Sequence, residues 1–154
     1  MQMKRLLYFI IFAVLTVFAI GCQEKVDMPD IKSDIVGQWK LLEINDKDSG
    51  NMTVYADFRS DASFTLYQKV WTVGYEKFEG TFELLGGGGV RFNYSDGNVS
   101  EYISLSFEDD AAKMILRKAD GEIDIYGASS IPEQVISQAK PAVCARSGAV
   151  RPLL

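Results

Sequence analysis

Residues 77–84 read KFEGTFEL, a stretch in which apolar and polar side chains alternate with a period of two. In an extended chain Phe78, Phe82 and Leu84 lie on one side, and the charged and hydroxyl side chains between them lie on the other. A helix would scatter the same apolar residues around its circumference. The stretch therefore predicts a β-strand with one buried face and one hydrated face.

The same alternation recurs on both sides of this stretch, from about residue 34 onward. Short clusters of Gly, Asp, Asn and Ser separate the alternating runs, and such residues allow the chain to reverse. The four glycines at 86–89, for example, indicate a hairpin tip, since no Lys-Ser/Thr pair follows them as in a phosphate loop. We predict eight strands, at residues 35–44, 52–59, 63–70, 75–85, 90–95, 99–108, 113–118 and 122–127.

Short connections make each predicted strand antiparallel to its predecessor. Eight strands in up-and-down order can close on themselves, which removes the exposed edges of an open sheet. We therefore expect an all-β fold, an eight-stranded antiparallel up-and-down barrel with a short C-terminal helix. The helix is indicated by the capping-box order SIPE at residues 130–133, with Val135, Ile136 and Ala139 as an apolar stripe. Residues 141–154 show no strong period, and we expect disorder there.

The first 21 residues have the pattern of an export signal. Residues 1–5 hold Lys4 and Arg5, and residues 6–20 are apolar except for Thr16. A helix over those 15 residues spans about 22 Å, less than the roughly 30 Å of a hydrocarbon core. We therefore interpret residues 1–21 as a signal peptide that is removed.

Residues 19–22 read AIGC, which resembles the lipobox of bacterial lipoproteins, although leucine is more usual where Ala19 stands. The resemblance implies cleavage before Cys22 and acyl chains on its thiol and on the new amino terminus. Several acyl chains at about 0.8 kcal/mol per buried methylene give stable anchoring. The alternative is an ordinary secretory signal with a coincidental cysteine. We expect a lipid-anchored protein of the cell envelope, at the outer membrane. The sequence does not decide between the periplasmic face and the cell-surface face.

Residues 22–33 comprise the lipidated cysteine and a polar, charged segment, which we expect to be a flexible linker. The barrel domain with its helix should occupy residues 34–140. Once Cys22 carries lipid, Cys144 has no partner cysteine in the chain. It would then be a free thiol or an intermolecular one.

Composition argues against several function classes. After removal of residues 1–21 the chain has 14 basic and 21 acidic side chains, a net charge of −7. Such a charge repels phosphate backbones, so we expect no nucleic-acid partner. The chain has no histidine, the commonest general base and metal ligand. We expect no catalytic residues, cofactor or metal and no enzymatic activity, although paired carboxylates of the glycosidase type stay open.

Residues 37–39 read GQW, which resembles the Gly-x-Trp motif that opens the first barrel strand of lipocalins. With the strand count and the late helix, the chain resembles the lipocalin-like lipoproteins of Bacteroidota. In that family the tryptophan closes the base of the interior, and a late arginine lies over it, for which Arg117 is the nearest candidate. The resemblance implies binding of a small apolar molecule, without naming one.

One face of each predicted strand should line the barrel interior. These residues either contact a ligand or simply fill the core. They are Trp39, Phe64, Leu66, Phe78, Phe82, Phe92, Tyr94, Ile103, Leu105 and Leu116. Tyr67, Trp71 and Tyr75 are candidates for the rim of a mouth, with surface packing as the alternative.

Two functions follow from these alternatives. The first is a lipid-anchored protein that binds a small apolar or amphipathic ligand. The second is an envelope interaction or structural module with a filled barrel core and an unidentified protein partner. A cavity of about 300 Å³ or more, lined by the predicted aromatic residues, would favour the first.

Overall fold

The computed structural model describes residues 34–70, 72–142 and 151–154. The predicted signal peptide, Cys22, Trp71 and Cys144 lie outside the described residues. Within the described part, no helix is both long enough and apolar enough to cross a bilayer. The export signal and the lipid anchor therefore stay predictions.

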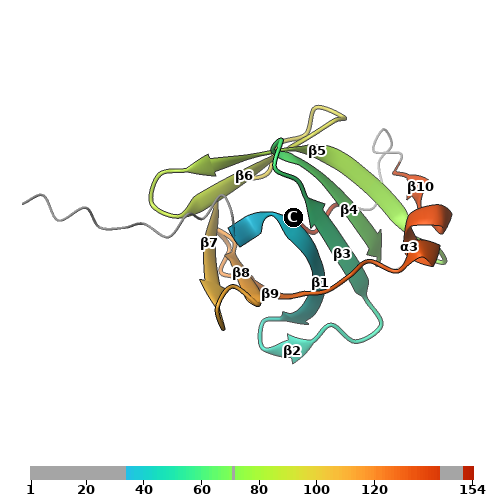
Figure 1. The fold of residues 1–154 in the computed structure, drawn as a ribbon, viewed down its shortest axis with the longest axis horizontal. Helices are drawn as coiled ribbons and strands as arrows, with labels where there is room; N and C mark the ends of the chain where they lie inside the picture. The colour runs from blue at the N-terminus through green and yellow to red at the C-terminus, as the bar shows by residue number, and fades with distance from the viewer. Residues whose placement is uncertain (1–33, 71, 143–150) are drawn as a thin grey trace, which may run out of the picture.

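Eight strands form a closed barrel, in which each strand pairs antiparallel with the next and the last pairs with the first (Figure 1). The predicted eight-stranded antiparallel up-and-down barrel with one short C-terminal helix is confirmed. Seven of the strands begin and end within two residues of their predicted limits. The barrel strands are β1 (Gly37–Ile44), β3 (Thr53–Phe58), β4 (Ser63–Lys69), β5 (Glu76–Leu85), β6 (Gly89–Tyr94), β7 (Ile103–Glu108), β8 (Lys113–Arg117) and β9 (Ile123–Ala128).

Strand β7 is shorter than predicted, because it begins at Ile103 and not at residue 99. Val99 makes only an isolated bridge with Asn93 and is 58% exposed. The Ser100 hydroxyl then accepts a hydrogen bond from the Phe92 N–H at 2.9 Å. Serine side chains compete with strand ladders in this way, so the ladder between β6 and β7 is interrupted here.

Two short strands lie outside the predicted set. Strand β2 (Lys47–Asp48) folds back on the end of β1, and β10 (Lys140–Pro141) runs parallel to the start of β5. Asn45 and Asp46 have φ values of 51° and 59°, which allow the tight reversal between β1 and β2. Neither short strand interrupts the closed barrel.

Strand β10 covers an edge that the barrel leaves open. Strand β5 pairs with β4 through residues 76–81, but with β6 only from Gly80 onward. The first residues of β5 therefore lack a partner on the β6 side. There the Lys140 N–H donates to the Tyr75 carbonyl at 3.0 Å, and the Ala142 N–H donates to the Lys77 carbonyl at 2.9 Å.

The core fills the barrel from all eight strands. Four phenylalanines, Phe58, Phe64, Phe82 and Phe92, contact one another with ring centroids 5.3–6.1 Å apart. Tyr94 adds an edge-to-face contact with Phe64 at 5.4 Å. Aromatic pairs of this kind contribute about 0.5–1.5 kcal/mol each beyond the burial of their area. We call these side chains the aromatic cluster. They pack against one another and fill one part of the barrel interior.

The helix α3 (Glu133–Gln138) covers part of the outer surface of the barrel (Figure 1). Val135 and the preceding Ile131 form a second apolar cluster with Tyr55 of β3 and Tyr67 of β4. The predicted capping box is wrong, because Pro132 stands at the N-cap and no side chain caps the helix. The predicted stripe is partly wrong too, since Ile136 is 46% exposed. A helix this short buries a single position, Val135.

Residues 151–154 lie inside the ring of strands, where Figure 1 places the end mark of the chain. The side chain of Leu154 is 6% exposed and belongs to the main core. The expectation of disorder is therefore wrong for these four residues, whereas residues 143–150 lie outside the described part. The alternation of apolar and polar residues could not reveal this segment, because it is held by side chains 83 and 60 positions away in the sequence.

Candidate functional site: the barrel mouth

The two ends of the barrel differ. In an up-and-down barrel alternate connections lie at the same end. One end, which we call the floor, has the turns at residues 59–62, 86–88 and 109–112 and the entry into β1. The other end, which we call the mouth, has the connections at 45–52, 70–75, 95–102 and 118–122.

Trp39 lies near the floor, as the lipocalin resemblance implies. Its side chain is 2% exposed, its indole N–H donates to the Ile35 carbonyl at 2.9 Å, and its ring lies 6.0 Å from that of Phe107. Arg117 does not follow the resemblance, because it is exposed and pairs with Ser104 and Ile123 near the mouth end of β8. The expectation that Arg117 lies over the tryptophan is wrong, since the side chain next to Leu116 on a strand points to the opposite face.

The structure brings all ten predicted interior residues together. Each is buried, and all belong to the main core cluster: Trp39, Phe64, Leu66, Phe78, Phe82, Phe92, Tyr94, Ile103, Leu105 and Leu116. Their burial shows that they lie in the barrel interior. It does not show that a ligand contacts them. As a set of ligand-binding residues they stay a prediction.

Sequence reasoning missed the polar residues of the interior. Gln68 and Asp124 are fully buried, and so is Tyr126, whose side chain is large. The residues share the inward face with apolar partners, since Gln68 pairs with Val54, Asp124 with Leu116 and Tyr126 with Met114. An inward polar residue is a functional signal because burial of a polar group is costly without a partner.

Gln68 binds residues 151–154 at the mouth through both polar atoms of its side chain. Its Nε2 donates to the carbonyl of Arg151 at 2.9 Å, and its Oε1 accepts the N–H of Leu153 at 3.1 Å. The hydroxyl of Tyr94 donates to the carbonyl oxygen of Leu154 at 2.6 Å. Two inward side chains from β4 and β6 therefore hold the backbone of residues 151–154.

Asp124 and Tyr126 have fewer polar partners than Gln68. Among the described residues the Tyr126 hydroxyl and the Asp124 Oδ1 have no hydrogen-bond partner. Asp124 does form an ion pair, since its Oδ2 lies 2.9 Å from the Nζ of Lys118, which also donates to Glu122 at 2.5 Å. Glu76, which pairs with Gln68, also has a buried oxygen without a hydrogen-bond partner among the described residues, Oε2.

The pKa values follow from this environment. Burial raises the pKa of Asp124 against the opposing effect of Lys118, and burial raises the pKa of Tyr126 further, with Asp124 as the next cause. Burial disfavours the charge of Lys118, but its bonds to Glu122 and Asp124 outweigh this and raise its pKa. The Tyr126 hydroxyl is therefore neutral near pH 7 and can donate a proton in a hydrogen bond.

A cleft of about 430 Å³ opens at the mouth. It lies between the β6–β7 and β8–β9 connections and is lined by residues 100–103, 118–120 and 151–154. Of the predicted interior residues only Ile103 lines it. The cleft exceeds the volume that we set for a ligand site, but its walls are mixed polar and apolar and are not the aromatic cluster. The arrangement suits an amphipathic molecule better than a wholly apolar one.

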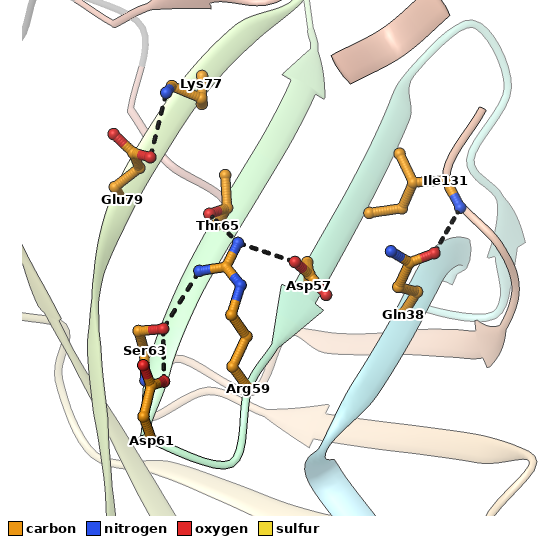
Figure 2. Close-up of polar contacts among 9 residues, drawn as sticks. All are labelled: Gln38, Asp57, Arg59, Asp61, Ser63, Thr65, Lys77, Glu79 and Ile131. Atoms are coloured by element: carbon orange, nitrogen blue, oxygen red, sulfur yellow. Dashed lines mark hydrogen bonds and ion pairs between the residues drawn. The ribbon is translucent and has the colours of Figure 1, made fainter. Parts of the chain in front are cut away.

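A polar network covers the outer face of β3 and β4 (Figure 2). The Arg59 guanidinium donates to Asp57 at 2.8 Å, to the Thr65 hydroxyl at 2.8 Å and to the Ser63 hydroxyl at 3.2 Å. Asp61 accepts the Ser63 hydroxyl at 2.6 Å. Thr65 is buried, but the Arg59 guanidinium is largely exposed, and ion pairs of exposed groups contribute little stability.

The Gln38 side chain also points outward, and its Oε1 accepts the Ile131 N–H at 2.9 Å (Figure 2). This bond links β1 to the segment that leads into α3. No group of three or more His, Cys, Asp or Glu side chains that could hold a metal ion occurs in residues 34–70, 72–142 and 151–154.

Comparisons with known proteins give a likeness in fold only. No protein-family model matches the chain, and no curated protein does. Among solved structures, the chain is similar to a lipocalin-like protein from Bacteroides uniformis ATCC 8492, with 17% identity and a TM-score of 0.48, over 62% of this chain and 99% of that one. It is also similar to an uncharacterized protein from Bacteroides eggerthii DSM 20697, with 18% identity and a TM-score of 0.46, over 61% of this chain and 98% of that one.

Proposed function

We propose that this protein is a lipid-anchored, non-enzymatic component of the cell envelope whose barrel binds a small amphipathic ligand at its mouth. The observation that carries the proposal is the buried pair Asp124 and Tyr126 beside an apolar core. In the described part of the chain the Tyr126 hydroxyl and the Asp124 Oδ1 have no partner, and the Asp124 Oδ2 forms an ion pair with Lys118. Small-molecule sites combine apolar walls with a few placed polar groups of this kind.

The polar groups indicate which ligand chemistry fits. Glu76 and Asp124 offer carboxylate oxygens that accept hydrogen bonds, and Tyr126 can accept one as well. A ligand with a hydroxyl or ammonium group would supply the missing donors, and its apolar body would lie along the cleft against Ile103 and Leu153. A carboxylate ligand would instead bring a second negative charge toward Asp124, which is unfavourable in a low-dielectric interior.

Isothermal titration with ligands of equal chain length tests this chemistry. We expect decanol and decylamine to bind at least about tenfold more tightly than decanoate, a difference of about 1.4 kcal/mol. The double variant Asp124→Asn, Tyr126→Phe should lose most of this preference while it keeps the apolar walls. If decanoate binds as tightly as decanol to the unmodified protein, the assignment of the polar groups is wrong. Native mass spectrometry of protein from its own membranes would show a natural ligand directly.

The lipid anchor is tested separately. Cys22→Ala should yield protein without acyl chains that leaves the membrane fraction, because the acylated thiol is the expected anchor. Cys144→Ala is the matched control and should remain acylated and membrane-bound. Acyl chains found by mass spectrometry on the Cys22→Ala protein would overturn the anchor.

The second candidate function, an envelope interaction or structural module without a small ligand, has its own supporting observation. The aromatic cluster is in mutual contact, and residues 151–154 fill part of the mouth. Under this alternative none of the three amphiphiles binds, and native mass spectra of membrane-derived protein show no small molecule.

A further inference from the structure

Residues 151–154 are bound as an external peptide would be bound. The contacts to their backbone come from side chains far away in the chain, Gln68 and Tyr94. The contact to their apolar side chains comes from the main core, which includes Leu154 and packs against Leu153. The backbone of residues 151–154 therefore has hydrogen-bond partners at the mouth, and its apolar side chains have packing partners there.

The contacts of Gln68 match the geometry of an extended peptide. The Arg151 carbonyl and the Leu153 N–H are two residues apart, so they lie on the same edge of an extended segment. One primary amide has a donor and an acceptor and can bond to both. Pro152 between them has no N–H, so no donor of that residue is left without a partner. Gln68 thus takes the role of a neighbouring strand.

An empty mouth would leave Gln68 in an unfavourable state. Its side chain is fully buried, and both of its described partners belong to residues 151–154. Buried polar groups are costly when they lose their partners. The interior is thus built to hold a molecule with a carbonyl acceptor and an N–H donor at peptide spacing.

We infer that the barrel mouth is a binding site for an extended aliphatic peptide segment and that residues 151–154 occupy it in cis. The segment lines the same cleft that a small ligand would enter. The segment takes up part of the mouth beside this cleft, so its release should enlarge the space open to a ligand. This last step rests on the proposed function, whereas the occupancy itself does not.

The occupancy is tested by amide exchange in the full chain. In the unmodified protein the Leu153 N–H should exchange slowly, because Gln68 accepts it in the interior. Leu154→Asp places a charge in the core and should speed this exchange at least tenfold and shift the side-chain amide resonances of Gln68. Leu154→Ala should give an intermediate effect. Ile136→Asp, which introduces the same charge at an exposed position of α3, should leave both signals unchanged. Fast Leu153 exchange in the unmodified protein would overturn the inference.

Addition of a peptide tests whether the site accepts the same chemistry in trans. The acetylated tetrapeptide Arg-Pro-Leu-Leu, at millimolar concentration, should return the Gln68 resonances of the Leu154→Asp protein toward their original positions. The peptide Arg-Pro-Asp-Asp should not. If neither peptide moves these resonances, the mouth is not a peptide site.

Competition is measured with decanol as the probe. Leu154→Asp should bind decanol at least tenfold more tightly than the unmodified protein and the Ile136→Asp control. Equal affinity, with release of the segment shown by exchange, would disprove competition. If decanol binds to no form, the proposed function fails, and the peptide site is judged by the exchange and peptide results alone.

Discussion

Tyr126→Phe should stabilise the protein, although it removes a polar group from a native core. The Tyr126 hydroxyl is fully buried and has no partner among the described residues, whereas in the unfolded chain water solvates it. An unsatisfied buried polar group costs about 1–3 kcal/mol. Removal of the oxygen leaves a void of roughly 10 Å³, which costs about 0.3 kcal/mol. We therefore expect a net gain of about 1–2 kcal/mol in the free energy of unfolding.

Urea unfolding at pH 7, followed by circular dichroism, measures this gain as a higher midpoint at constant m-value. Tyr94→Phe is the matched control, because its hydroxyl donates to Leu154 at 2.6 Å. That variant should lose about 0.5–1.5 kcal/mol, the net contribution of an ordinary hydrogen bond. A loss of 1 kcal/mol or more in Tyr126→Phe would refute the reasoning, since the hydroxyl would then have a partner such as an ordered water or a retained ligand.

Three further predictions concern stability, each measured by urea unfolding. Trp39→Ala should cost about 3–5 kcal/mol, because a nearly fully buried indole is removed; a loss below about 1 kcal/mol would mean that the floor is misplaced. Burial raises the pKa of Asp124 above its ordinary 3.8, so the stability contributed by its neutral form is present below pH 3.8 and lost as pH rises through the raised value. Asp124→Asn should therefore gain stability relative to the unmodified protein between pH 3.5 and about 7; parallel curves would contradict this. Gly80→Ala should cost about 3 kcal/mol, because the new Cβ would lie 2.2 Å from the Asn93 carbonyl oxygen, whereas Gly86→Ala, with no atom within 4 Å, should change little.

The barrel could be predicted because its strands obey a local rule. Phe78 and Phe82 face inward on β5, as their period of two indicates, and the turn clusters between strands mark where the chain reverses. The ten predicted interior residues are buried for the same reason. The start of β7 was not predictable from this rule, because the Ser100 hydroxyl replaces a ladder bond and the alternation continues through the interruption.

The polar part of the candidate site could not be predicted from periodicity. Ile123 and Ile125 are the apolar members of their strand, yet Asp124 and Tyr126 are the residues that point inward. Only the pairing of Tyr126 with Met114 and of Asp124 with Leu116 decides the face, and pairing is not visible in one strand. Residues 151–154 were missed because their partners, Gln68 and Tyr94, are distant in sequence.

The short parallel strand β10 has a consequence for solubility. It occupies the carbonyls of Tyr75 and Lys77 on the side of β5 that β6 does not reach. An uncovered strand edge is a template for pairing with another molecule. The double variant Lys140→Pro, Ala142→Pro would remove the two N–H donors and keep residues 151–154, and it would present this edge to solvent. This variant should self-associate through β5, so we expect residues 140–142 to protect this edge from aggregation.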